Sequence, residues 1–174
     1  MAARLIIDGY NLLRSTARYA EDVDRDLDSA RERLSADVGA RAGEGQDVTV
    51  VFDGGNNPHS DGQPRLHGGI TVIFSPAGTD ADSVIESLAA AAREAGEDTE
   101  VVTSDVATRW TSVGGPVVVT RASTFARELA SDDAEWREQR DAAAHGKATV
   151  SDRLADDVRQ HLDRLAGRRR PSQR

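Results

Sequence analysis

The 174-residue sequence contains no cysteine and a single lysine, Lys147. The lack of cysteine excludes disulfides, thiolate metal sites and cysteine nucleophiles. No apolar run approaches the ~20 residues needed to cross a bilayer. The N-terminus also lacks the apolar core of a signal peptide. We therefore expect a cytoplasmic enzyme or binding protein with no membrane partner.

Basic residues are fewer than acidic ones, and the formal net charge is −8. This excess of negative charge argues against a nucleic-acid partner. Its distribution weakens that argument, because Arg164–Arg174 holds five arginines and no acid. This segment is either an electrostatic tether for polyanions or a solvated, disordered end, and both interpretations stay open.

Strand patterns alternate with helix patterns along the chain. Five segments have the apolar composition of buried strands, namely Leu5–Ile7, Asp47–Phe52, Ile70–Phe74, Glu100–Ser104 and Pro116–Thr120. Apolar residues at helical spacing predict helices between these strands and after them, over Leu27–Ala42, from Asp82 to Ala95, from Ser123 into Ala144 and from Ser151 to Leu165. The long polar loop Gly54–Gly68 interrupts this alternation, and such loops are often functional.

The alternation predicts an α/β fold, a single Rossmann-like domain whose mostly parallel five-stranded sheet is flanked by helices. We expect this domain to cover residues 1–146 of the sequence. A C-terminal helix over 147–166 and a basic, disordered tail over 167–174 are expected to follow.

Aspartates stand where several of these strands end. Asp8, Asp53 and Asp105 each follow a predicted strand, and Asp82 lies in the first turn of a predicted helix. Parallel strands share their C-terminal edge, and ligands bind along that edge near the switch in strand order. The topology therefore brings these carboxylates towards one cleft. Asp80, beside Thr79, fits a helix cap better than a ligand.

Several carboxylates in one cleft either take up protons or bind a cation. Two carboxylates ~5 Å apart repel each other by ~3 kcal/mol at an effective dielectric constant near 20. Hard oxygen ligands without histidine or thiolate favour Mg²⁺ or Mn²⁺. A cluster of this type polarises a phosphodiester and activates water. The residues therefore predict metal-dependent hydrolysis.

A set of short motifs occurs in a consistent order along residues 4–140. These motifs are Asp8-Gly-Tyr-Asn11, Val50-Val-Phe-Asp53, Val72–Phe74 with Ala81-Asp82, Thr103-Ser-Asp105 with Trp110 and Gly114, and Ala126–Leu129. In this order the sequence resembles the YacP-like branch of NYN-domain proteins, which belong to the PIN-like nucleases. The resemblance implies a metal-dependent endoribonuclease with a Rossmann-like sheet. One branch of the family is associated with the ribosome and cleaves mRNA there.

By matching position, the resemblance implies that Asp8, Asp82 and Asp105 are the principal ligands of Mg²⁺ or Mn²⁺. Asp53 would complete the cluster, and Asn11 would orient a ligand, water or phosphate. The sequence departs from the family where Asp80 stands and in the glycine- and histidine-rich loop 54–68. Both departures bear on the preferred substrate more than on the chemistry.

The expected partner is RNA, single-stranded or messenger, with the ribosome as a further partner. Arg14, Arg65 and Arg109 are candidates for holding its phosphates, and ordinary surface solubility is the alternative for each. Tyr10 and Trp110 either stack on unpaired bases or pack under the active edge, and we favour packing. The sequence does not indicate an oligomeric state.

Other classes fit less well. A phosphatase with Asp8 as its nucleophile needs a second acid two residues later, where Tyr10 stands. A receiver-like phosphoacceptor needs a lysine after a late strand, but the only lysine is Lys147. The stronger alternative is a non-catalytic RNA- or ribosome-binding module, which would tolerate loss of the acids.

Overall fold

The protein is described from a computed structural model of the whole chain. The structure describes residues 3–43, 45–55, 60–104, 116–132, 134–135, 137–138 and 140–142. The chain divides into two compact units, Met1–Ser131 and Asp132–Arg174. The described residues of the second unit are helical. The predicted C-terminal helix over 147–166 and the tail over 167–174 lie outside the described residues, so both stay predictions.

The first unit is built on one sheet of six strands. These strands are β1 (Arg4–Asp8), β2 (Asp47–Phe52), β3 (Arg65–His67), β4 (Ile70–Phe74), β5 (Thr99–Thr103) and β6 (Val117–Arg121). They lie in the order β3-β4-β2-β1-β5-β6, and every neighbouring pair is parallel except β3 and β4. The predicted α/β fold with a mostly parallel sheet is confirmed.

The sheet has one strand more than predicted, because β3 forms inside the segment expected to be a loop. Its three residues are all exposed, so they carry no alternation of apolar and polar side chains. Gly68 and Gly69, both with positive φ, turn the chain from β3 into antiparallel pairing with β4. Backbone pairing to β4, rather than burial, makes this segment a strand.

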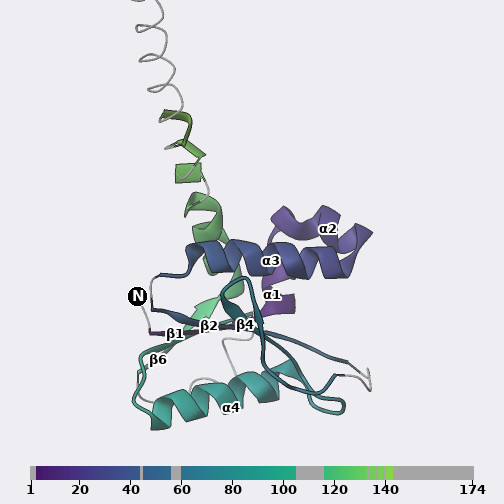
Figure 1. Cartoon of the computed structure of the whole chain (residues 1–174), viewed down its shortest axis with the longest axis vertical. Helices are drawn as coiled ribbons and strands as arrows, with labels where there is room; N and C mark the ends of the chain where they lie inside the picture. The colour runs from purple at the N-terminus through teal and green to yellow at the C-terminus, as the bar shows by residue number, and fades with distance from the viewer. Residues whose placement is uncertain are drawn as a thin grey trace, which may run out of the picture. The chain divides into compact units, whose positions relative to one another are not determined.

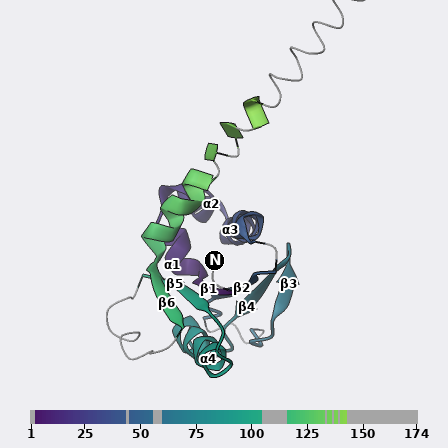
Figure 2. The same ribbon diagram turned by 90° about the vertical axis from the view of Figure 1, so that its left-hand side faces the viewer.

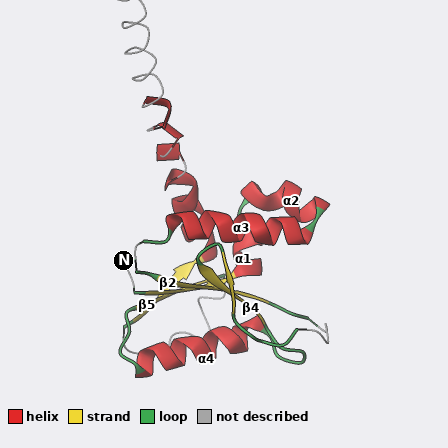
Figure 3. Ribbon diagram, in the orientation of Figure 1, coloured by secondary structure: helices red, strands yellow, loops and turns green. Residues whose placement is uncertain are grey.

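Helices cover both faces of the sheet, as Figures 1 and 3 show. They are α1 (Gly9–Arg14), the 3₁₀ helix η1 (Ala17–Tyr19), α2 (Ala20–Arg25), α3 (Leu27–Arg41) and α4 (Ala81–Glu94). Residues 122–132 are also helical. Seen along the sheet in Figure 2, α4 lies on one face and α1, α2 and α3 lie on the other. Within the described ranges, no helix combines the length and the apolar character needed to cross a membrane.

The two core layers follow from alternation along the central strand. Leu5 and Ile7 of β1 belong to the cluster that includes Leu34 of α3, whereas Ile6 packs with Ile85 of α4. Because helices cover both faces, every side chain of β1 after Arg4 is buried. Asp8 is the last of them, so the architecture places a carboxylate where an apolar residue would be expected.

The passage from β1 into α1 has no connecting loop, since β1 ends at Asp8 and α1 begins at Gly9. A Cβ atom on Gly9 would lie 2.3 Å from Cε1 and 2.5 Å from Cδ1 of the Phe52 ring. Phe52 is itself fully buried, so the ring has little room to withdraw. Glycine is therefore required at this position by close packing, with no need for a positive φ.

We expect Gly9→Ala to lower the free energy of unfolding by about 1–3 kcal/mol through overpacking against Phe52. Chemical denaturation of the variant measures this cost. Phe52→Val removes the ring atoms in question, so the double variant should lose less stability than the two single variants together. Strict additivity would show that the ring is not what excludes a side chain at Gly9.

Candidate active site

The strand order reverses at β1. From β1 the chain first builds outward through β2 to β4, and then returns to the other side of β1 with β5 and β6. Ligands of open α/β sheets bind at such a switch point, beyond the carboxyl ends of the strands. Asp8 is the residue that ends β1, and only 6% of its surface is exposed.

Asn11 holds the Asp8 carboxylate from two sides. The backbone N–H of Asn11 donates to Oδ1 of Asp8 at 3.0 Å, which makes Asp8 the N-cap of α1. The side-chain Nδ2 of Asn11 donates to Oδ2 of Asp8 at 2.6 Å and to Oγ1 of Thr103 at 3.2 Å. Both hydrogens of Nδ2 are thereby committed, so the amide oxygen is the atom of Asn11 left for a ligand.

Burial raises the pKa of the Asp8 carboxyl above its ordinary value. The nearby carboxylate of Asp82 raises this pKa further, while the N–H groups of Asn11 and Tyr10 and the guanidinium of Arg14 lower it. The ionised form of Asp8 is therefore less favourable in the folded protein than in water. A cation beside Asp8 and Asp82 would remove this disadvantage.

A cavity of about 630 Å³ opens over Asp8. Its lining comprises Asp8, Tyr10, Asn11, Leu13, Arg14, Val23, Leu27, Asp53, Gly55, Asp80, Ala81 and Asp82. The structure thus brings together five of the predicted site residues: Asp8, Asn11, Arg14, Asp53 and Asp82. Asp105 and Arg109, which the sequence also nominated, lie outside the described residues.

Arg65 lies beside the cavity over Asp8 and is not part of its lining. It lines a neighbouring cavity of about 260 Å³, together with Arg31 and Asp53. Its guanidinium pairs with Asp61 at 3.2 Å, within the same polar segment. Asp53 lines both cavities, so Arg65 stands one cavity away from Asp8.

Two of the carboxylates in the cavity also hold backbone. Asp80 is the N-cap of α4 and accepts from the N–H of Ser83 at 2.8 Å, as its position beside Thr79 predicts. Asp53 is exposed and accepts from the N–H of Gly55 at 2.6 Å, which closes the turn after β2. Asp82 lies in the first turn of α4.

The donors around Asp8 fit a hard divalent cation. Carboxylate oxygens of Asp8 and Asp82 and the amide oxygen of Asn11 are the ligand types that Mg²⁺ and Mn²⁺ take. Among the residues that the structure describes, no three histidine, aspartate or glutamate side chains form a group that could hold a metal ion. In the sequence, Asp105 comes two residues after the end of β5, the neighbour of β1.

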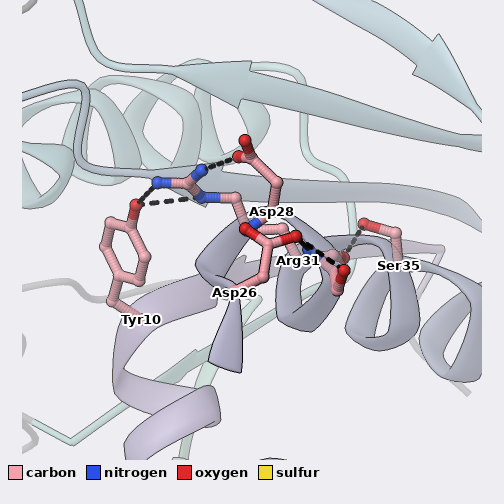
Figure 4. Close-up of polar contacts among 6 residues, drawn as sticks. Tyr10, Asp26, Asp28, Arg31 and Ser35 are labelled. Carbon is pink, nitrogen blue, oxygen red and sulfur yellow. Dashed lines mark hydrogen bonds and ion pairs between the residues drawn. The ribbon is translucent and has the colours of Figure 1, made fainter. Parts of the chain in front are cut away.

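Arg31 is a contributor to this region that sequence reasoning missed. Its guanidinium donates to the hydroxyl of Tyr10 and pairs with Asp28, as Figure 4 shows. It also lies 5.3 Å from the ring centroid of Tyr10 and 5.4 Å from that of Phe74. These contacts and the edge of Phe52 fix the ring of Tyr10 in the packed position that we favoured.

The mostly parallel sheet places the buried Asp8 at the switch point and further carboxylates in the same cavity. The family model of the YacP-like NYN domain matches residues 5–167, and the chain belongs to this family. NYN domains are generally nuclease-like. A comparison with curated proteins gave no match.

Two solved structures are similar to this chain over most of its length. A crystal structure of Rae1 (YacP) from Bacillus subtilis shares 23% identity at a TM-score of 0.58 and covers 94% of each chain. A mutant of the same Bacillus subtilis protein shares 26% identity at a TM-score of 0.57, over 78% of this chain and 79% of that one. Both likenesses support the fold described above.

The raised pKa of Asp8 leads to a prediction about stability. In metal-free buffer, the Asp8 carboxyl keeps its proton to a higher pH in the folded state than in the unfolded state. Its contribution to the free energy of unfolding is therefore complete below the ordinary pKa and is lost as the pH rises. The stability of Asp8→Asn relative to wild type should therefore increase between about pH 4 and pH 7. Chemical denaturation in the presence of a chelator, at a series of pH values, measures this difference.

Asp26→Asn is the matched control, because Asp26 is also an N-cap aspartate, here of α3. Hydrogen bonds from the hydroxyl and N–H of Ser29 lower the pKa of the exposed Asp26. The contribution of Asp26 is therefore complete above the ordinary pKa and is lost only below it. The stability of Asp26→Asn relative to wild type should stay constant between about pH 4 and pH 7 and rise only at lower pH. The same trend in both variants would contradict the assigned environment of Asp8.

Proposed function

We propose that this protein is an endoribonuclease that hydrolyses RNA phosphodiester bonds with the help of Mg²⁺ or Mn²⁺. The observation that carries the proposal is the buried Asp8, whose pKa is raised by burial and by Asp82 in a cavity that also contains Asn11 and Arg14. Membership of the YacP-like NYN family supports the nuclease class and an RNA substrate.

In this proposal Asp8 and Asp82 hold the metal, and Asp53 and Asp105 complete the acidic cluster. The bound ion supplies a Lewis acid that polarises the phosphodiester and activates water. Asn11 fixes the orientation of the Asp8 carboxylate through its two hydrogen bonds and presents its own amide oxygen to the site. Arg14, exposed in the wall of the cavity, pairs with a substrate phosphate.

The reaction is an in-line displacement at phosphorus. Water attacks on the side opposite the bridging 3′ oxygen, which leaves with a proton. The products are a 5′-phosphate and a 3′-hydroxyl. We propose endonucleolytic cleavage, as the resemblance to the YacP-like NYN family implies. The natural substrate that the resemblance suggests is ribosome-associated mRNA.

The proposal predicts that Asp8→Asn and Asp82→Asn each lower the rate of cleavage of a single-stranded RNA by ~100-fold or more in Mn²⁺. Asp80→Asn is the control, because asparagine caps a helix as well as aspartate does and Asp80 has the capping role. Its rate should stay within a few-fold of wild type. Product lengths and end groups, with and without EDTA, complete the measurement.

Wild-type cleavage that persists in EDTA, or normal cleavage by both Asp8→Asn and Asp82→Asn, would contradict the metal-dependent mechanism. An intact protein that binds RNA but never cleaves it in Mn²⁺ or Mg²⁺ would favour the alternative function, a non-catalytic RNA- or ribosome-binding module.

The arginine-rich segment at the C-terminal end of the sequence is proposed to tether RNA or the ribosome. Deleting Arg168–Arg174 should weaken RNA binding at low salt and make little difference at high salt, because phosphate contacts release counterions. Fluorescence anisotropy with a labelled RNA at several salt concentrations measures the change. Unchanged affinity at low salt would contradict the tether and favour the other interpretation, a solvated, disordered end.

A further inference from the structure

The cavity over Asp8 has a second wall of a different chemical character. Asp8, Asp53, Asp80 and Asp82 supply its carboxylates. Tyr10, Leu13, Val23 and Leu27 supply apolar surface to the same cavity. Metal coordination and hydrolysis use only the carboxylates, so the proposed function leaves this apolar wall without a role.

Leu27 is the most exposed member of that wall. It is 37% exposed, and it is one of only three large hydrophobic residues exposed among the described residues. It is the first residue of α3, and the N-cap Asp26 fixes its position by accepting from the N–H of Ser29 at 3.1 Å. The side chain of Leu27 is thus held at the cavity by an ordered helix end.

Val23 comes to the same cavity from α2. It is half-buried and packs against the core cluster on the α3 side of the sheet. An ion pair between Asp22 and Arg33 joins α2 to α3, so Val23 and Leu27 are held on connected elements. The wall is therefore preformed, as ligand-binding surfaces commonly are.

Arg14 lines the same cavity as the carboxylates of Asp8 and Asp82 and the apolar residues. It is exposed, and its guanidinium lies 5.6 Å from the ring centroid of Tyr10. Among the described residues, the contact assigned to Arg14 is this aromatic one, which leaves its donors available to an anion.

We propose that Val23 and Leu27 form a subsite for the nucleobase of the nucleotide that adjoins the scissile phosphate. This inference rests on the proposed function, because the carboxylates of the cavity fix where the phosphodiester lies. A nucleobase is the apolar-faced group that a phosphodiester substrate carries, and a cavity of about 630 Å³ has the size of sites for ligands of this class. Arg14 then pairs with the next phosphate along the strand.

The subsite determines the substrate class. A base inside a duplex is stacked and paired, so it reaches a protein wall only after unstacking, at a cost of a few kcal/mol. An unpaired base docks on Val23 and Leu27 without that cost. The subsite therefore responds to the presence of an unpaired base beside the scissile phosphate rather than to the hydrogen-bonding edge of that base.

The test is the steady-state cleavage in Mn²⁺ of an RNA with one cleavage site, and of the same RNA with an abasic nucleotide beside that site. Leu27→Ala should raise KM for the normal RNA by about fivefold or more and change kcat little. On the abasic RNA, wild type and Leu27→Ala should have the same KM. Leu66→Ala is the matched control, since Leu66 is 81% exposed but belongs to β3 and is not part of this cavity's lining.

Cleavage of both RNAs with equal KM by wild type, or a Leu66→Ala effect as large as that of Leu27→Ala, would overturn the base subsite while leaving the nuclease intact. If no variant cleaves RNA at all, the proposed nuclease function fails. The wall is then judged by the affinity of wild type and Leu27→Ala for the two RNAs, measured by anisotropy. The subsite is supported if wild type binds the normal RNA more tightly than the abasic RNA and Leu27→Ala does not. Equal affinities of wild type for the two RNAs overturn it.

Discussion

The central interaction of this structure is the pair of hydrogen bonds from Asn11 to the buried carboxylate of Asp8. Asp8 ends the central strand at the place where the strand order reverses, and burial raises its pKa. Asn11 offsets part of this cost by donating to both carboxylate oxygens, one from its backbone and one from its side chain. The second hydrogen of that side chain reaches Thr103 at the end of β5, so one amide links the ends of two neighbouring strands.

Close packing makes this arrangement possible. The chain leaves β1 and enters α1 without a loop, and Gly9 is the residue that fits beside the ring of Phe52. The same ring meets Tyr10 at its edge, and Arg31 holds the hydroxyl of Tyr10 from α3. The first turn of α1 is therefore fixed by side chains from β2 and α3, and this turn carries the groups that hold Asp8.

Much of this site could be predicted from the sequence, because the order and direction of the strands determine which residues meet at the sheet edge. Apolar runs ended by aspartates identify strands, and parallel strands share an edge, so Asp8, Asp53 and Asp82 were expected at one cavity and lie there. The α/β fold itself was predicted for the same reason. The position of Asp105 was predicted in the same way and stays a prediction.

The parts that could not be predicted depend on tertiary contacts. β3 carries no apolar pattern and exists through pairing with β4. In the sequence, Arg31 is indistinguishable from a solvent-exposed helix arginine. In the structure its guanidinium lies near the rings of Tyr10, Phe52 and Phe74. Val23 and Leu27 read as ordinary helix residues, and only the packing of α2 beside α3 brings both to the acidic cavity.

The most direct test of the account follows the Asp8 carboxyl carbon by NMR as the pH is varied, first without divalent metal and then with Mg²⁺. The account predicts a titration midpoint above the ordinary aspartate value in the metal-free protein. It also predicts a clear downward shift of this midpoint with Mg²⁺, because a metal ligand must lose its proton. A midpoint that Mg²⁺ does not move would contradict the claim that Asp8 is the centre of a metal-dependent nuclease site.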